Sequence, residues 1–318
     1  MKGIAIAGTL LVDKINEIGK FPQAGELTQI KSISRAVGGC VPNVGIDLKR
    51  IDGNLTVKAV GAIGKDEEGD FLRKTLSDSG LDVSGLKEYD EKTSFTDVMS
   101  VAGGERTFFT YAGASALFGE SDVDFDKINA EMLHLGYFLL LDKVDNGDGL
   151  KILKKAKANG VKTSIDLVSE NSDRYKQVLP CLPFVDNLII NEIEGGKLAG
   201  IEPKKENIRK ISEKLKELGV KERVIIHLPE FGACLSEKGY TEVPSFDLPK
   251  GYIKGATGAG DAFCAGALYG IYKGYSDKEI LEFSSMCAVM SLRGKDAVSG
   301  VVDEKDIREF CKGFNRKP

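Results

Sequence analysis

Short apolar runs alternate with amphipathic stretches along most of the chain. The apolar runs are predicted to be buried strands, at Gly3–Gly8, Leu55–Ile63, Met132–Leu141, Val161–Leu167, Asn187–Asn191 and Arg223–Leu228. The stretches between them include predicted helices at Asp66–Ser79, Gly147–Ala158 and Lys204–Leu218. Strands that alternate with helices in this way predict an α/β fold, in which helices cover a mostly parallel sheet.

Two segments, Leu27–Val37 and Thr93–Tyr111, break this alternation with β-type patterns and no helix between strands. The second predicts a hairpin with strands Phe95–Val101 and Arg106–Tyr111 and a turn at Gly103-Gly104. Both segments are compatible with one small sheet outside the main one. Such a sheet would serve as a lid over a cleft or as a contact in a dimer.

Composition and charge exclude several classes of protein. The 318 residues carry a formal net charge of -4 with both signs mixed, which gives no footprint for nucleic acid and no polybasic patch for a membrane. The apolar start of the chain is too short for a signal peptide, and no apolar stretch approaches the length of a membrane span. We therefore expect a cytoplasmic protein without a nucleic-acid or membrane partner.

Cysteine and histidine usage argues against disulfides and against a zinc site rich in histidine. The six cysteines form no C-x-x-C pair, and most lie in apolar surroundings, which is typical of reduced and buried residues. His134 and His227 are the only histidines in the sequence.

The most informative motif is the run from Gly255 to Phe263, which reads Gly-Ala-Thr-Gly-Ala-Gly-Asp-Ala-Phe. The residues after it are small and apolar, which predicts a buried helix with Asp261 in its first turn. Glycines at 258 and 260 leave the backbone amides free to point into one space, and the positive helix end favours an anion there. A carboxylate beside such amides can accept a hydroxyl proton during phosphoryl transfer.

Two other glycine motifs do not fit. The dinucleotide pattern G-x-G-x-x-G fails because Phe263 occupies the position of the third glycine, and no Gly-Lys pair has the earlier glycine of a P-loop. Alternatively, the glycines of the Gly255–Phe263 motif have only a structural role and allow close packing of helices.

The motif resembles the D-T-x-G-A-G-D signature of the ribokinase-like (PfkB) carbohydrate kinases, and the resemblance extends over nearly the whole chain. Further matches, in chain order, are Asp13, the G-G-x-x-x-N pattern of Gly38-Gly39 and Asn43, the segment Gly61–Asp66, and Asn191 with Glu194. The resemblance implies a three-layer αβα core from residues 1–10, 37–92 and 112–318, and a discontinuous β lid from residues 11–36 and 93–111.

The resemblance also implies a role for each matched residue. Asp261 is the expected catalytic base, with Gly258, Ala259 and Gly260 forming the anion hole. Asp13, Gly38, Gly39 and Asn43 are expected to hold the acceptor; Asn191, Thr257 and Gly232 to contact the nucleotide; and Glu194 to bind Mg²⁺ through water. Without the resemblance, Asp13 is a turn residue and Asn43, Asn191 and Glu194 are ordinary helix-cap residues. Arg106 in the lid hairpin is expected to be solvated, although it could reach an anionic group of the substrate.

Two positions depart from the family pattern. The aspartate that begins the signature is Gly255 here, so metal anchoring is expected to depend more on Glu194. The nucleotide-loop pattern T-x-G-x-x-G is replaced by a segment from His227 to Gly232, and Pro229 within it removes a backbone donor. The sequence therefore defines the nucleotide preference less well than it defines Asp261 as the catalytic base.

Together these features predict an ATP-dependent kinase that transfers the γ-phosphoryl group to a hydroxyl of a sugar, a primary one being the first expectation. A nucleoside kinase of the same family and a non-catalytic sugar-binding relative are the alternatives. Phe95, Phe108, Phe109 and Tyr111 in the lid could stack on a base, but sheet packing explains them equally well. A requirement for a monovalent cation and a homodimer formed through the lid are left open.

Overall fold

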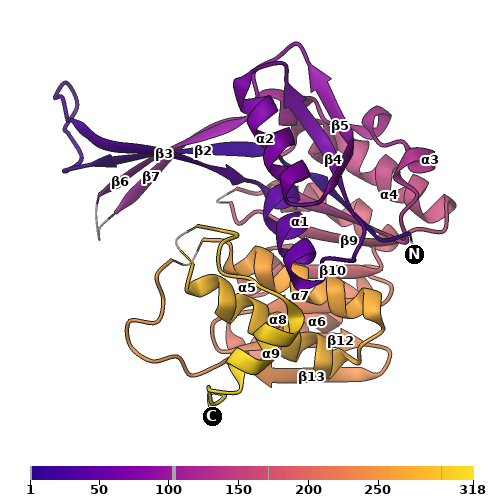
Figure 1. Cartoon of the computed structure of the whole chain (residues 1–318). Helices are drawn as coiled ribbons and strands as arrows, with labels where there is room; N and C mark the ends of the chain where they lie inside the picture. The colour runs from indigo at the N-terminus through magenta and orange to yellow at the C-terminus, as the bar shows by residue number, and fades with distance from the viewer. Residues whose placement is uncertain (1, 102–104, 171, 256, 295) are drawn as a thin grey trace.

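The structure is a computed structural model that describes the whole chain except residues 1, 102–104, 171, 256 and 295 (Figure 1). The strands are β1 (Ile4–Gly8), β2 (Leu11–Ile18), β3 (Ile30–Gly38), β4 (Val57–Gly64), β5 (Asp82–Tyr89), β6 (Phe95–Val101), β7 (Arg106–Tyr111), β8 (Met132–Phe138), β9 (Lys162–Leu167), β10 (Asn187–Asn191), β11 (Arg223–His227), β12 (Phe231–Ser236) and β13 (Gly239–Pro244). The helices are α1 (Cys40–Ile51), α2 (Glu67–Asp78), α3 (Phe125–Ile128), α4 (Gly149–Ala158), α5 (Glu192–Ala199), α6 (Ile208–Glu217), α7 (Ala259–Lys273), α8 (Asp277–Leu292) and α9 (Glu304–Cys311).

The larger sheet has nine strands in the order β13-β12-β11-β10-β9-β8-β1-β4-β5. Its strands pair in parallel from β5 to β11, and β12 and β13 add an antiparallel edge. All five residues of β1 are buried, as expected for a strand covered on both faces. The predicted α/β fold with a mostly parallel sheet is confirmed.

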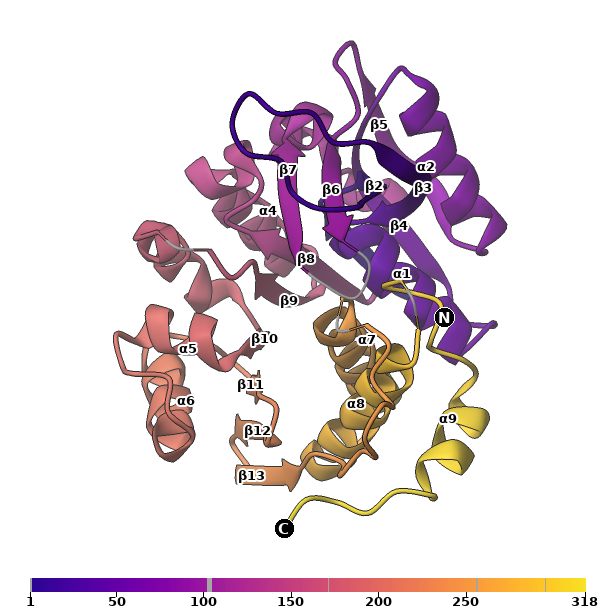
Figure 2. The same ribbon diagram turned by 90° about the vertical axis from the view of Figure 1, so that its left-hand side faces the viewer.

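Helices cover both faces of this sheet and give three layers. In Figure 2, α4, α5 and α6 lie on one side of the strands, and α1, α7 and α8 lie on the other. Each face has its own apolar cluster, one including Leu48 of α1 and Leu268 of α7, the other including Leu153 of α4 and Ile211 of α6. Successive side chains of a buried strand therefore face the two clusters in turn, as Ile4 and Ala5 of β1 do, which explains the continuous apolar runs.

A second sheet of four strands, in the order β3-β2-β6-β7, projects from one end of the core (Figure 1). The predicted hairpin has the predicted bounds, β6 and β7, while its turn at Gly103-Gly104 lies outside the described residues. β2 pairs with β6 in parallel and with β3 in antiparallel fashion, so two distant chain segments build one sheet. The two segments that broke the alternation of strands and helices in the sequence thus form one small sheet outside the main one, as the sequence analysis considered.

Several element ends differ from the prediction. The strand predicted for Met132–Leu141 ends at Phe138, because Tyr137 and Leu139 have the left-handed φ values of 60° and 76° and interrupt the extended backbone. The helix predicted for Lys204–Leu218 begins at Ile208, after a short 3₁₀ turn.

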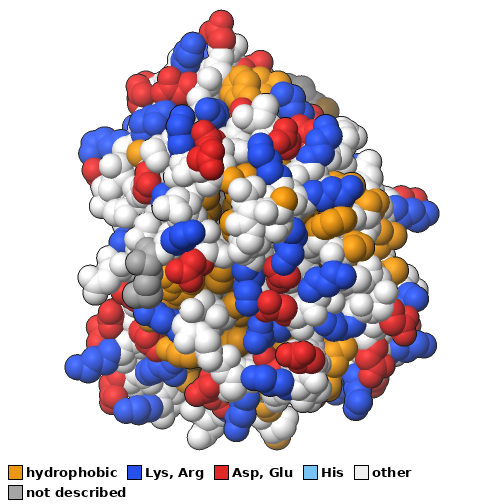
Figure 3. Space-filling model, turned by 90° about the vertical axis from the view of Figure 1, so that its right-hand side faces the viewer, with side chains coloured by type: hydrophobic (Ala, Val, Ile, Leu, Met, Phe, Trp, Pro, Cys, Tyr) orange, Lys and Arg blue, Asp and Glu red, His pale blue; other side chains and the backbone are white. Residues whose placement is uncertain are grey.

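The surface carries charges of both signs. Figure 3 shows Lys and Arg side chains interspersed with Asp and Glu over one face, in keeping with the mixed charge of the sequence. Among the described residues, the helices include none that is long and apolar enough to cross a membrane.

Candidate active site

The candidate site lies where the carboxyl ends of the central strands meet the start of α7. A cavity of about 280 Å³ is lined there by Asp166 from β9, Asn191 at the end of β10, His227 at the end of β11, and Gly258 and Asp261 from the glycine turn. Open α/β sheets bind their ligands at this edge, because loops and helix starts converge there.

The glycine turn delivers Asp261 into this cavity. Gly258 has a φ of 84°, and a Cβ atom there would lie only 2.5 Å from the carbonyl oxygen of Ala297, so glycine is required on both grounds. Helical bonding starts with the amide of Ala262, which donates to the Gly258 carbonyl. The amides just before Ala262 therefore have no acceptor within the helix, which leaves them free to bind an anion, and the predicted anion hole stays a prediction.

Asp261 lies in the first turn of α7 and is 7% exposed. The Asn43 side-chain amide donates to one of its carboxylate oxygens at 2.9 Å, and the Tyr137 hydroxyl is 3.0 Å from both oxygens. Burial, together with the negative charge of Asp166, raises the pKa of Asp261 to about 7, although both hydrogen bonds act in the opposite direction. A carboxyl group with this pKa can exchange a proton near neutral pH.

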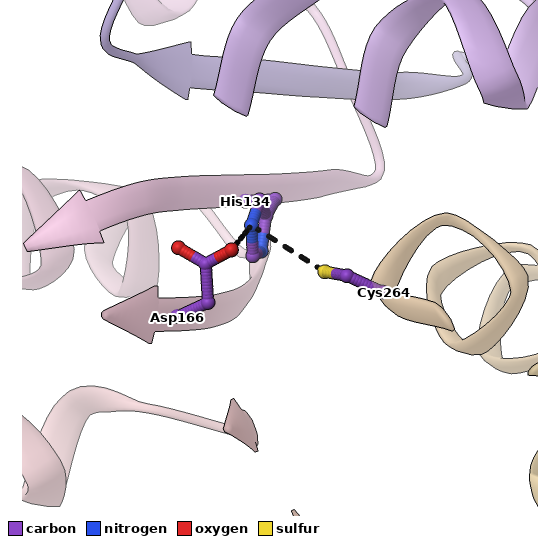
Figure 4. Close-up of side chains that lie close together, drawn as sticks. All are labelled: His134, Asp166 and Cys264. Atoms are coloured by element: carbon purple, nitrogen blue, oxygen red, sulfur yellow. Dashed lines mark hydrogen bonds and ion pairs between the residues drawn. The ribbon is translucent and has the colours of Figure 1, made fainter. Parts of the chain in front are cut away.

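Asp166 belongs to a buried cluster with His134 and Cys264, shown in Figure 4. The His134 Nε2 atom lies 3.5 Å from an oxygen of Asp166 and 3.6 Å from the Cys264 sulfur, while Nδ1 is paired with the Ser164 hydroxyl at 2.9 Å. The Tyr137 amide donates to the other oxygen of Asp166 at 2.5 Å. These contacts fix the position of Asp166 in the lining of the cavity.

Asn191 and Glu194 form a capping box at the start of α5. The Asn191 side chain accepts from the Glu194 amide, and Glu194 accepts from the Asn191 amide at 3.0 Å and from the Ser169 hydroxyl at 2.8 Å. Glu194 is 4% exposed, and burial raises its pKa to about 7 against those hydrogen bonds. Both residues line the same cavity as Asp261. The structure thus shows the helix cap, and the position of both residues in the cavity lining leaves room for the predicted role in ligand binding.

A second cavity, of about 450 Å³, lies under the smaller sheet and contains Asp13. Burial raises the pKa of Asp13 to about 6. A Cβ atom on Gly38 would lie 2.6 Å from an oxygen of Asp13, so the glycine makes room for this carboxylate. Arg106 and Thr257 line the same cavity, and the Arg106 guanidinium approaches the Thr257 hydroxyl at 3.4 Å. The exposed Arg106 is thus solvated, as expected, and also links the smaller sheet to the glycine turn.

The remaining residues of the predicted acceptor group, Gly39 and Asn43, lie at the start of α1. Gly39 precedes α1 with a φ of 92°, and a Cβ there would collide with the Thr9 carbonyl at 2.4 Å. Asn43, one turn into α1, is 4% exposed and contacts Asp261. Its side-chain oxygen has no hydrogen-bond partner among the described protein atoms. The sequence did not anticipate that Asn43 would hold the expected base.

A third cavity, of about 470 Å³, lies on the opposite side of the glycine turn and is mostly apolar. It is lined by Gly232, Ala259 and Gly260, with Phe246, Leu248, Ile253 and Val289 among its apolar residues. His227 borders both this cavity and the central one. Its ring packs on Phe263 with centroids 4.8 Å apart, and burial lowers the pKa of His227 to about 4, so it is neutral at physiological pH.

Tyr137, Asp166 and His227 are site residues to which the sequence analysis assigned no role. Asp166 could have been found as a carboxylate near the carboxyl end of a predicted buried strand. Tyr137 lies within a run predicted as regular strand, and its orientation depends on a backbone irregularity that no residue pattern indicates. Gly255, the departure from the signature, is half-buried at the entrance to the glycine turn.

Comparison with known proteins identifies the family of this chain. The family model of the pfkB family carbohydrate kinases matches residues 1–304. The chain is 24% identical to a ribokinase of Arabidopsis thaliana over 315 residues, which is 97% of this chain and 81% of that protein. It is 25% identical to fructokinase-1 of Zea mays over 327 residues, covering 96% of each chain.

Solved structures share the fold. Arabidopsis thaliana ribokinase complexed with ribose and ATP superposes with a TM-score of 0.83 at 23% identity, covering 98% of both chains. The Methanocaldococcus jannaschii nucleoside kinase, an archaeal member of the ribokinase family, gives a TM-score of 0.80 at 19% identity, covering 98% of this chain and 99% of that one. With the family model spanning nearly the whole sequence, the chain belongs to the pfkB family of carbohydrate kinases.

Proposed function

We propose that this protein transfers the γ-phosphoryl group of ATP to a primary hydroxyl of a sugar or sugar derivative, with Asp261 as the base. One observation carries the proposal: the short turn from Thr257 to Asp261 borders all three cavities. Thr257 lines the cavity under the smaller sheet, Asp261 the central one, and Ala259 the apolar one. An acceptor and a nucleotide on either side of this turn would present their reacting groups to each other.

In this mechanism the acceptor hydroxyl gives its proton to Asp261 as its oxygen forms a bond to the γ-phosphorus. The bond from that phosphorus to the bridging oxygen breaks, and ADP leaves with the electron pair. The amides at the start of α7 stabilise the charge on the transferring group, because they have no acceptor within the helix. The pKa of about 7 suits Asp261 to this role, since the charged form is available at neutral pH.

The central cavity also has the donor set for Mg²⁺. Glu194, Asn191, Asp166 and the Ser169 hydroxyl all line it, and they offer oxygen ligands. The Glu194 carboxylate is engaged by several donors, so it would hold a hydrated Mg²⁺ through water. The ion would neutralise charge on the nucleotide phosphates. Nothing in the donor set depends on the aspartate that Gly255 replaces.

The cavity under the smaller sheet and the apolar cavity differ in their lining residues, and each lining suits one of the two substrates. The apolar cavity beside Gly232 offers flat hydrophobic walls for a nucleotide base. The cavity under the smaller sheet is also lined by many apolar residues, but it adds the charged side chains of Asp13, Arg106 and Asp296 and several hydroxyl groups, which suit a polyol. Phe108 also lines that cavity, and an aromatic ring there favours a nucleoside acceptor as the second candidate.

We propose that the smaller sheet, residues 11–36 and 93–111, is a lid that excludes water during transfer. Its inner face lines the acceptor cavity, whereas Ile33 and Phe109 on the other face are 74% and 59% exposed. These exposed apolar side chains and the open edges at β3 and β7 support a homodimer formed through the lids, which sedimentation or light scattering would detect. The six buried, unpaired cysteines support a cytoplasmic location.

The deciding experiment measures ADP release with ATP, Mg²⁺ and a panel of sugars and nucleosides. We expect at least one sugar to stimulate turnover, and the Asp261→Asn variant to lose at least about 100-fold in kcat. A panel in which only nucleosides react would favour the second candidate. If no acceptor stimulates turnover while a sugar still raises the melting temperature, the protein is a sugar-binding relative and the kinase proposal fails. Omitting potassium from the assay tests the monovalent-cation requirement.

A further inference from the structure

The end of β8 has an unusual backbone that aims one side chain at Asp261. The pairing of β8 with β9 shifts register between Leu135 and Phe138, which is the mark of a bulge. Within it, Tyr137 has a φ of 60°, a conformation that is uncommon for residues other than glycine. Strained residues of this kind persist only where the surroundings hold them, and they concentrate at functional sites.

Carboxylates hold this backbone in place. The Tyr137 amide donates to Asp166 at 2.5 Å, and the amide of Leu139, which also has a positive φ, donates to Asp145 at 2.8 Å. Both strained residues are thus anchored by a buried carboxylate. The result is a side chain that leaves the strand and points across the cavity toward α7.

The Tyr137 hydroxyl lies 3.0 Å from each oxygen of Asp261. Burial, and then the charge of Asp261, raises the pKa of Tyr137 well above its ordinary value, so the phenol keeps its proton and acts as a donor at any physiological pH. Asn43 donates to one oxygen of the same carboxylate, which leaves lone pairs on the other oxygen for an incoming hydroxyl. The carboxylate is therefore held from two sides, by α1 and by β8.

We propose that Tyr137 is a positioning residue for Asp261: its phenol keeps the carboxylate oriented and ionised so that it can accept the proton of the acceptor hydroxyl. This role deepens the proposed function and rests on it. A hydrogen bond to the charged form of a carboxyl group favours that form, and here it opposes the burial of Asp261. Among the described residues, the other titratable groups that face Asp261 or line its cavity are Asp166, Cys40, Cys264, Asp47, Glu194 and His227.

The Tyr137→Phe variant removes the hydroxyl and keeps the ring. Its matched control is Tyr89→Phe, because the Tyr89 hydroxyl also contacts both oxygens of one aspartate, Asp122, at 2.8 and 2.9 Å, in a part of the core outside the three cavities. We expect Tyr137→Phe to lower kcat about tenfold at neutral pH, to leave both KM values within about twofold, and to move the acid limb of the kcat profile up by about one pH unit. Raising the pH should restore much of the lost kcat, and Tyr89→Phe should show none of these changes.

A second measurement needs no turnover. The pKa of Asp261 is followed by carbon NMR of labelled aspartate carboxyls, with Asp261→Asn to assign the signal. We expect it to rise by about one unit in Tyr137→Phe and to stay unchanged in Tyr89→Phe. An unshifted Asp261 titration overturns the positioning role, and so does a raised KM for the sugar with kcat unchanged. If the titration shifts but the wild type phosphorylates no acceptor, the proposed function fails while the hold of Tyr137 on Asp261 stands.

Discussion

At the scale of single residues, the site gathers carboxyl groups that the fold makes difficult to ionise. Asp261 and Glu194 both have a pKa of about 7, with burial as the main cause. Each is charged in the unfolded chain above its ordinary pKa of roughly 4. To be active in the proposed reaction, the folded protein must therefore ionise these carboxyl groups although their burial favours the neutral form.

The sign of the resulting pH dependence follows from this difference. Between pH 4 and 7, roughly, the unfolded chain has released the Asp261 proton and the folded protein has kept it, so this group lowers stability as the pH rises. The Asp261→Asn variant should thus be more stable than the wild type at about pH 8, by a few kcal/mol at most, and should lose that advantage at about pH 4. Urea unfolding at both pH values measures it, with exposed Asp126→Asn as the control. A destabilised Asp261→Asn protein at about pH 8 would show that its hydrogen bonds outweigh the cost of burial.

At the scale of elements, the regular parts were predictable and the irregular ones were not. The bounds of β6, β7 and β10 follow from apolar and β-branched runs, and the start of α7 from the small residues after Asp261. The bulge at Tyr137 could not be predicted, because tertiary contacts to Asp166 and Asp261 hold it. For the same reason the sequence could nominate Asn43 for the site through family resemblance and still not show that it contacts the base.

The glycine turn gives a prediction at this scale, because its conformation and its neighbours both demand glycine. Gly258→Ala would place a Cβ 2.5 Å from the Ala297 carbonyl on a backbone with a φ of 84°. Gly251 has almost the same φ, 83°, with nothing within 4 Å of the added Cβ, so Gly251→Ala isolates the conformational cost of about 1–2 kcal/mol. We expect Gly258→Ala to lose clearly more stability than that and to lower kcat/KM at least tenfold, measured by urea unfolding and by the kinase assay. Equal losses of stability in the two variants would mean that the loop that carries Ala297 moves away from the added Cβ atom at no cost in free energy.

At the scale of the whole molecule, chain segments far apart in sequence meet at the glycine turn. The smaller sheet borders the proposed acceptor cavity through Asp13 and Arg106, and the last residues of the chain border the proposed nucleotide cavity through Lys317. Phe246 forms a β-bridge with Arg316, whose guanidinium lies 3.8 Å from the centre of the Phe246 ring. The C-terminal segment thus acts as a wall of the proposed nucleotide site, and it lies beyond residue 304, where the family match ends.

Within the C-terminal segment, Lys317 is the residue that we expect to affect nucleotide binding. Its ammonium group donates to the Pro229 carbonyl at 2.8 Å, in the loop that departs from the family's nucleotide pattern, and its amide donates to the Ser245 carbonyl. A half-buried cation at this point can attract the nucleotide phosphates and hold the altered loop in place.

We expect Lys317→Gln to raise KM for ATP about fivefold, equivalent to about 1 kcal/mol, with KM for the sugar unchanged. Lys312→Gln, which alters an exposed lysine of the same segment, should leave both values unchanged. A normal KM for ATP in Lys317→Gln would limit the C-terminal segment to a structural role, because its backbone pairing with Ser245 survives the substitution.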